Sequence, residues 1–464
     1  MTDTSKLWQS SATVLTALYR SGDASPVEAL AATLSRLDET NAALNAVVTI
    51  DRDGAHEAAR ASEKRWRARS PLGPLDGVPI TVKDNISVAG VRSTWGSRLY
   101  GDHIPERDET PVLRAREGGA VILGKTNVPE MTLQGYTWNP LFGTTRNPWD
   151  TALTPGGSSG GAVAAVATGI GPLALATDGG GSIRRPASHA GLVGLKPTIG
   201  RVPRRDGFPP ILLDMEVIGP IARTVADLAA ASAVISAPDP AAVNQTGYGP
   251  IGVAAARPLR ILHVPTLADA PVDPEIAASV AEASAALSGL GHRVEDGRGF
   301  ALADPINALW PTIAQTGLAW LTERKRDALG PDIRAMAESG AAFPATRFFD
   351  ALHTALMLRQ ELAAFFRGYD MILTPTAAAV PWAAETTHPT EIAGQPVGPR
   401  GSAIFTGFVN AAGCPAISIP CRPSSADLPI GFQLIAPWGA DDDLLAVAAA
   451  YEAAHPWQML WHRG

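Results

Sequence analysis

Apolar residues along the chain follow two spacings, and these predict helices alternating with strands. Between positions 25 and 40 they recur every three or four residues, behind Ser25-Pro26-Val27-Glu28. That pattern predicts a helix with a capping box and a proline in its first turn. A similar pattern over Thr224–Asp227 predicts a second capped helix that ends near Val234. Short apolar runs at 78–82 and 120–123 predict buried strands.

The same patterns assign most of the remaining chain. Further helices are predicted over 10–50 (two helices, the second being the capped one), 53–67, 110–117, 274–289, 441–454, and in stretches between loops over 305–367. Further strands are predicted over 260–264, 371–373, 416–420 and 430–435. Residues 236–258 are predicted to be a loop or linker. Alternating strands and helices indicate an α/β fold with a mainly parallel or mixed sheet.

An uncharged segment of membrane-spanning length runs from Gly160 to Thr177. Gly169, Gly171 and Pro172 interrupt it, and most of its other residues are alanine. A buried helix that turns into a buried strand explains it better than a membrane span.

Composition excludes several functional classes. The 464 residues are 46% hydrophobic and 18% charged, which permits a large core, and the net charge of -7 offers no basic surface to nucleic acid. Cys414 and Cys421 are too few for a disulfide framework, lack zinc-ligand partners and are interpreted as small core residues. The first residues, MTDTSKLW, do not resemble a signal peptide. We therefore expect a cytoplasmic protein without metal or cofactor.

A glycine-rich stretch, Gly156–Arg201, holds two turns that each deliver a serine, Ser158 and Ser182. A serine hydroxyl becomes a good nucleophile only when a base takes its proton. His189 is the nearest histidine, but no G-x-S-x-G elbow or recognisable Ser-His-Asp context accompanies it. Lys83, at the end of an apolar strand, is a second candidate, because burial can leave a lysine neutral near pH 7.

Several motifs together resemble the amidase signature family. They extend over nearly the whole chain: Gly77–Asp84, Gly124–Asn127, Gly156–Gly161, Thr177–Arg184, Gly194–Thr198, Leu373–Thr376 and Leu428–Leu434. The spacing of Lys83, Ser158 and Ser182 also fits. The resemblance implies one large α/β/α fold, with a twisted mixed sheet flanked by helices on both faces. Within it we expect an N-terminal helical region (1–70), a signature core (71–235) and a remainder (236–464) in which helices near 300–367 cover the pocket.

The resemblance also implies the roles of the site residues. Ser182 would be the nucleophile, Ser158 a bridging serine in a cis peptide bond, and Lys83 the neutral base. The oxyanion hole would be formed by the backbone N–H groups of Gly179, Gly180, Gly181 and Ser182. Ser159, Asp178 and Arg184 would support the site. The family usually has a larger residue at the position of Gly179, so its glycine is expected to leave extra room.

The implied activity is hydrolysis of linear amides through an acyl-enzyme. Candidate pocket residues come from the variable regions and carry few charges: Met131, Tyr136, Trp138, Ile211, Leu212, Leu213 and Trp310. They favour neutral apolar or aryl amides and leave esters and carbamates open. The alternative is the glutamine-hydrolysing component of a tRNA-dependent amidotransferase, although the glycine- and tyrosine-rich segment usual in that component is absent from Phe343–Tyr369. A catalytically dead scaffold is the third hypothesis. We expect a monomer or homodimer without nucleic-acid or membrane partners.

One motif misleads. Gly119–Thr126 satisfies the phosphate-loop pattern G-x-x-x-x-G-K-[ST]. Its four middle residues are themselves the predicted strand, and an extended strand cannot fold its amides around a phosphate. We therefore do not expect nucleotide binding.

Overall fold

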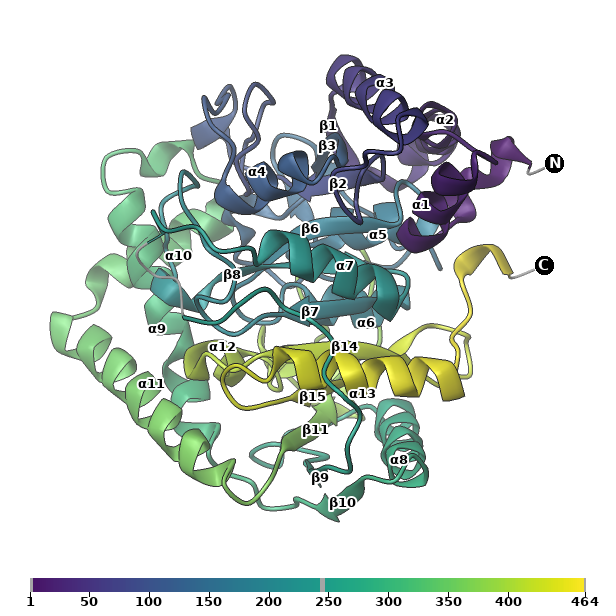
Figure 1. The fold of residues 1–464 in the computed structure, drawn as a ribbon. Coiled ribbons are helices and arrows are strands. Elements are labelled where there is room, and N and C mark those ends of the chain that lie inside the picture. The colour runs from purple at the N-terminus through teal and green to yellow at the C-terminus, as the bar shows by residue number, and fades with distance from the viewer. Residues whose placement is uncertain (1–2, 243–246, 463–464) are drawn as a thin grey trace.

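Eleven strands from all parts of the chain form one mixed sheet (Figure 1). The computed structural model describes residues 3–242 and 247–462, so positions 243–246 of the predicted linker lie outside the described residues. The strands, in spatial order across the sheet, are β1 (Val47–Ile50), β3 (Val121–Thr126), β2 (Pro79–Lys83), β6 (Leu173–Asp178), β8 (Val217–Ala222), β7 (Val193–Lys196), β14 (Ala416–Cys421), β15 (Ile430–Ile435), β11 (Met371–Pro375), β9 (Arg260–His263) and β10 (Arg293–Asp296).

Strand direction changes across the sheet. β3, β2 and β6 are parallel neighbours, as are β11, β9 and β10, whereas the strands between these two groups pair antiparallel. Two short hairpins lie outside the sheet: β4 (Trp138–Asn139) with β5 (Gly143–Thr144), and β12 (Glu391–Ile392) with β13 (Gln395–Pro396). The fold is therefore α/β with a mixed sheet, as predicted.

Helices cover both faces and one end of the sheet. In Figure 1, α7 and α13 lie in front of the central strands. The helices are α1 (Ala12–Ser21), α2 (Pro26–Leu44), α3 (Arg52–Arg67), α4 (Thr110–Glu117), α5 (Gly160–Thr168), α6 (Arg184–Ala190), α7 (Val225–Ile235), α8 (Pro274–Gly289), α9 (Asp304–Leu321), α10 (Pro331–Ala342), α11 (Ala345–Phe365), α12 (Gly407–Ala412) and α13 (Asp441–Ala454). The helices α9 to α12 pack on one another and share a separate apolar cluster.

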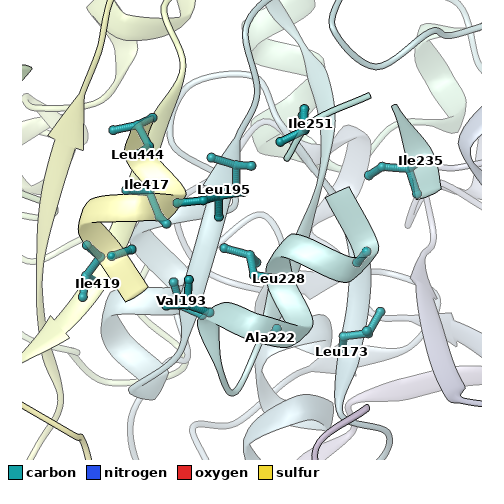
Figure 2. Close-up of a cluster of buried hydrophobic side chains, with 14 of the residues drawn as sticks. Leu173, Val193, Leu195, Ala222, Leu228, Ile235, Ile251, Ile417, Ile419 and Leu444 are labelled. Carbon is teal, nitrogen blue, oxygen red and sulfur yellow. The ribbon is translucent and has the colours of Figure 1, made fainter. Parts of the chain in front are cut away.

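Alternation along the central strands gives the two faces of the sheet different cores. On β6, Leu173 and Leu175 join a cluster with residues of α7 and α13, which Figure 2 shows around Leu228 and Leu444. The alternate β6 residues are alanines, and they pack against α5 and α6. Small side chains on this second face let α5 and α6 lie close to the sheet, with the serine-bearing turns at their N-terminal ends.

The Gly160–Thr177 segment is a helix followed by a strand, as predicted: α5 leads into β6. None of the helices in 3–242 and 247–462 is long and apolar enough to cross a membrane.

Several element predictions were wrong. The range 10–50 holds two helices but also β1, which pairs with β3. The strands β7, β8 and β10 were missed. β8 contains Gly219 and Pro220, residues that disfavour strands, and β10 is the polar sequence Arg-Val-Glu-Asp. Burial between β6 and β7 overrides the local preference in β8.

The predicted second capping box is only half formed. Thr224 Oγ1 accepts a hydrogen bond from the Asp227 N–H at 3.2 Å, which caps α7. The Asp227 carboxylate accepts instead from the N–H groups of Ala12 and Thr13, at 2.8 and 3.0 Å. It therefore fastens the first turn of α1 to the core.

Candidate active site

Lys83 is the last residue of β2, and its side chain is fully buried beside Ser158. Its Nζ lies 2.8 Å from Ser158 Oγ, 2.8 Å from Thr177 Oγ1 and 3.1 Å from the Thr177 carbonyl oxygen. A neutral amine has two N–H donors and one lone pair, so it can donate to Thr177 and accept from Ser158. The ammonium form could instead donate to all three acceptors, so the contacts accommodate both protonation states.

Burial lowers the pKa of Lys83 from 10.5 to about 7, although Glu216 and Asp178 act in the opposite direction. Removal from water disfavours the charged ammonium, and neither of these carboxylates contacts Nζ directly. Near neutral pH, Lys83 is therefore divided between its protonated and neutral forms.

The first glycine turn presents Ser158 to this lysine. The Gly157–Ser158 peptide bond is cis. Ser159 Oγ donates to the Thr177 carbonyl oxygen over 3.4 Å, which links the turn to β6. Two strands and one turn thus meet at Thr177, a residue to which sequence reasoning gave no role.

A buried ion pair holds the second turn. Arg184 donates to Asp178 through Nε at 3.0 Å and through Nη2 at 2.8 Å, and neither side chain is exposed. The same guanidinium donates to Gln433 Oε1 and Asn410 Oδ1. Burial alone would raise the pKa of Asp178, but Arg184 and Asn410 hold it well below its usual range.

The Asp178 carboxylate also fixes backbone groups around Ser182. It accepts from the N–H groups of Gly181 at 2.8 Å and Ile183 at 3.1 Å. The Gly181 N–H, expected to serve in the oxyanion hole, is therefore engaged by Asp178. Within the described residues, no hydrogen bond is donated by the N–H groups of Gly179, Gly180 or Ser182.

Gly181 is required by its surroundings. Its φ of +108° is unfavourable for residues with a side chain, and an added Cβ would overlap Thr406 Oγ1. Thr406 Oγ1 in turn donates to the Gly180 carbonyl oxygen at 2.8 Å. The turn is consequently held from two sides, and Ser182 retains 6% exposure. No hydrogen bond of the described residues joins Ser182 Oγ to Ser158.

His189 is buried, and the hydrogen bond of its ring among the described residues goes to neither serine. Its Nε2 lies 3.2 Å from the Ala379 carbonyl oxygen, and its ring packs edge-on against Trp382. Burial lowers the pKa of His189 to about 4, so the ring is neutral at physiological pH. Its contacts include neither Ser158 nor Ser182, and they favour the structural interpretation.

The candidate pocket residues divide into two groups. Leu212 and Trp310 lie against the second turn: a Cβ at Gly179 would overlap Leu212 Cδ1, and one at Gly180 would lie 3.3 Å from Trp310 Nε1. Met131, Ile211, Leu212 and Trp310 belong to one apolar cluster, whereas Leu213 is exposed. Tyr136 and Trp138 line a different cavity of about 380 Å³, whose lining includes none of Lys83, Ser158 and Ser182.

The extra room expected at Gly179 is filled by Leu212. Gly179→Ala is expected to destabilise the fold by about 1–3 kcal/mol, because the new methyl group must displace Leu212. Thermal unfolding measures this effect, and adding Leu212→Ala should recover part of it. Gly180→Ala, whose methyl group has its nearest neighbour at 3.3 Å, is the matched control. Equal losses in the two single variants would contradict the proposed overlap.

The remaining sequence candidates are the phosphate-loop-like motif and the two cysteines, and both lie in positions typical of structural residues. β3 begins at Val121 within the phosphate-loop-like motif, and Lys125 is buried with its Nζ on the Ile86 carbonyl oxygen and Ser93 Oγ. Cys414 is buried and Cys421 half-buried, both as free thiols. In the described part of the chain, no cluster of three or more His, Cys, Asp or Glu side chains is placed to hold a metal ion.

The sheet, the helices on its two faces and the buried Lys–Ser–Thr cluster define a class: α/β proteins in which a buried lysine meets a glycine-rich serine turn. Residues 28–445 match the family model described as Amidase. The chain therefore belongs to the amidase signature family, and it is a hydrolase that acts on carbon–nitrogen bonds.

The relatives of this chain differ from one another in the activity that their names describe. The glutamyl-tRNA(Gln) amidotransferase A-type chain of Synechococcus sp. (strain CC9605) is 36% identical over 471 residues, covering 94% of each chain. Acylamidase of Rhodococcus erythropolis is 34% identical over 471 residues, covering 98% of each. A solved bacterial aryl acylamidase of the amidase signature family matches with a TM-score of 0.88 at 29% identity, covering 97% of this chain and 96% of that one.

Proposed function

We propose that this protein hydrolyses small linear amides through an acyl-enzyme on Ser182, with Ser158 and Lys83 as the proton relay. The observation that carries the proposal is the buried, 2.8 Å contact between Lys83 Nζ and Ser158 Oγ. A lysine with a pKa of about 7 can accept a proton at neutral pH and return it.

In the first half of the reaction, Ser182 Oγ attacks the amide carbonyl carbon and passes its proton through Ser158 to Lys83. The carbon–nitrogen bond then breaks, and the amine leaves with the proton that Lys83 returns. In the second half, a water molecule, activated by the same relay, hydrolyses the ester on Ser182 and releases the carboxylic acid. Each half returns the relay to its starting protonation state.

The negative charge that develops on the carbonyl oxygen needs hydrogen-bond donors. We assign this task to the backbone N–H groups of Gly179, Gly180 and Ser182, because the Gly181 N–H donates to Asp178. Arg184 and Asp178 act as positioning residues that hold the turn. Ser159 does the same for the first turn.

An apolar or aryl portion of the substrate would lie against Leu212 and Trp310, which border the second turn. The same chemistry extends to esters and carbamates, because the nucleophile attacks the carbonyl carbon in each. The acylamidase and aryl acylamidase relatives support the amide preference. A cytoplasmic location, which rests on the two free thiols, and a monomer or homodimer remain part of the proposal.

A fluorophosphonate probe should label the wild-type protein on the peptide that contains Ser182, because the activated serine attacks phosphorus as it attacks a carbonyl. Mass spectrometry of the digested protein measures the site. Labelling should disappear in Ser182→Ala and persist in Ser188→Ala, a buried serine of α6 outside the relay. Persistent labelling of Ser182→Ala would exclude Ser182 as nucleophile. Unlabelled wild-type protein would favour the dead-scaffold hypothesis.

The second candidate function is that of the glutamine-hydrolysing amidotransferase component, which the 36% identical relative favours. The region that differs, 343–369, is dominated here by the regular helix α11. Ammonia release from glutamine, together with co-purification of partner proteins, would support this candidate. Turnover of anilides by the isolated chain, without glutaminase activity, would oppose it.

A further inference from the structure

Two arginines, Arg185 and Arg400, form no side-chain hydrogen bond or ion pair within 3–242 and 247–462. Arg185 follows the paired Arg184, and its Nε is buried without a hydrogen bond. Arg400 lies in the loop before α12, and both side chains are half-buried. Neither guanidinium takes part in any hydrogen bond or ion pair of the described residues. Half-buried guanidinium groups without a partner in the protein are available to bind an anion.

Arg185 borders the turn that carries Ser182. A Cβ at Gly181 would lie 2.8 Å from Arg185 Nε, and one at Gly135 would lie 3.3 Å from its Nη1. Gly135 belongs to the loop against Gly157, so Arg185 stands between the two serine-bearing turns.

The Arg400 guanidinium lies at the start of α12, near the Trp310 ring. A Cβ at Gly407 would lie 2.9 Å from Arg400 Nη2 and 3.7 Å from the Trp310 ring. The other edge of that ring faces Gly180. Arg400 is also close enough to Arg185 to lower the pKa of Arg185, a reduction to about 9 to which burial contributes most. Both groups remain positively charged at neutral pH.

The carboxylates of this region are already engaged. Asp178 is paired with Arg184, and Glu216 is paired with Arg204 at 3.0 Å. Among the described residues, neither Arg185 nor Arg400 forms an ion pair with a carboxylate, although Asp178 favours the charged form of Arg185 from a distance. One guanidinium can bind both oxygens of a carboxylate through two parallel N–H donors, and a second guanidinium adds further charge-assisted hydrogen bonds.

We propose that Arg185 and Arg400 bind a carboxylate of the substrate, so that the preferred substrates are amides carrying a carboxylate a few bonds from the scissile carbonyl. This inference rests on the proposed function and replaces the expectation of a neutral substrate. The apolar part of such a molecule would still contact Leu212 and Trp310. Hydrolysis consumes one water and yields the free amine and an acid, while the recognised carboxylate is unchanged.

Matched substrates test the proposal. The mono-4-nitroanilide of succinic acid is compared with the analogue whose free carboxylate is a carboxamide, and N-acetyl-4-aminobenzoate with N-acetyl-4-aminobenzamide. The first pair places the charge on the acyl side and the second on the amine side. We expect the carboxylate to raise kcat/KM by about 10- to 100-fold in one pair, the range for charge-assisted hydrogen bonds. A ratio near one in both pairs would overturn the proposal.

Variants assign the preference to the two arginines. Arg185→Met and Arg400→Met should each reduce the carboxylate-to-carboxamide ratio of kcat/KM by about tenfold or more, and Arg400→Lys should retain part of it. Arg298→Met, at an exposed residue paired with Asp296, is the control and should leave the ratio unchanged. Methionine variants that lower both substrates of a pair equally would contradict carboxylate binding.

The experiments distinguish failure of the proposed amidase function from failure of the proposed carboxylate binding. If the fluorophosphonate does not label Ser182 and no amide is hydrolysed, the proposed function and this inference both fail. If Ser182 is labelled and the carboxamide analogues are hydrolysed as fast as the carboxylates, only the inference fails.

Discussion

Lys83→Met is expected to lower kcat/KM for a good amide substrate at pH 7 by about 10³- to 10⁴-fold, the upper range for the loss of a general base. Methionine has a similar length and no nitrogen to accept the Ser158 proton. Steady-state kinetics measures the loss. Lys83→Arg should be as inactive, because an arginine keeps its proton at every pH at which the protein is folded.

The pH profile separates a base from a merely structural lysine. Since the pKa of Lys83 lies at about 7, kcat/KM should rise with pH up to that value and level off above it. Below pH 7 the ammonium form accumulates, and each lower pH unit should cost about tenfold in rate. This limb should be absent from the residual activity of Lys83→Met.

Lys196 provides the matched control for Lys83. It is a second buried lysine, whose Nζ donates to the Pro197 carbonyl oxygen at 2.7 Å, and burial lowers its pKa to about 8. Lys196→Met should change stability more than the shape of the pH profile. If Lys83→Met kept a wild-type rate and profile, another group would have to be the base.

Arg184→Met is expected to destabilise the folded protein by about 3–5 kcal/mol, because it leaves the Asp178 carboxylate buried and without its counter-charge. Gln433 Oε1 and Asn410 Oδ1 would lose a donor at the same time. Chemical denaturation followed by circular dichroism measures the change. Activity should fall as well, since Asp178 holds the Gly181 and Ile183 amides.

Arg422→Met is the control for the buried pair. Arg422 pairs with Glu282 at 2.7 Å, but both side chains are largely exposed, so its removal should shift the denaturation midpoint little. Arg184→Lys keeps the charge without the planar fork, and we expect it to recover only part of the lost stability. Similar midpoints for Arg184→Met and Arg422→Met would show that the pair contributes no more than a surface contact.

Much of the fold could be predicted because its signals are local. The capped helix after Ser25, the buried strands at 78–82 and 120–123, and the helix–strand unit over 160–177 all appear in the structure at or near the predicted positions. The capping box is formed by groups three residues apart, and the strands need only a short run of apolar residues. β8 could not be predicted in this way, because its Gly–Pro pair becomes a strand only when flanked by β6 and β7.

The candidate site shows the same limit: residues within motifs could be predicted, whereas contacts between distant segments could not. From the sequence, Lys83, Ser158 and Ser182 could be proposed as catalytic residues and Asp178 and Arg184 as separate supporting residues, since each lies within a motif of adjacent residues. It could not identify Thr177 as the partner of Lys83, or Asp178 as the acceptor of the Gly181 N–H, because hydrogen bonds depend on distances set by the folded sheet.

Arg185 is the clearest example of a residue whose surroundings only the tertiary structure determines. The family motif gives Arg184 a supporting role and assigns no role to the adjacent Arg185. Only the tertiary structure decides that the first is neutralised by Asp178, while the second faces the serine-bearing turns with Arg400 beside it. The sequence determined which chemical groups are present and which motifs hold them. Packing of distant segments decided which charges are paired, because the free energy of a charge depends on neighbours that only folding brings together.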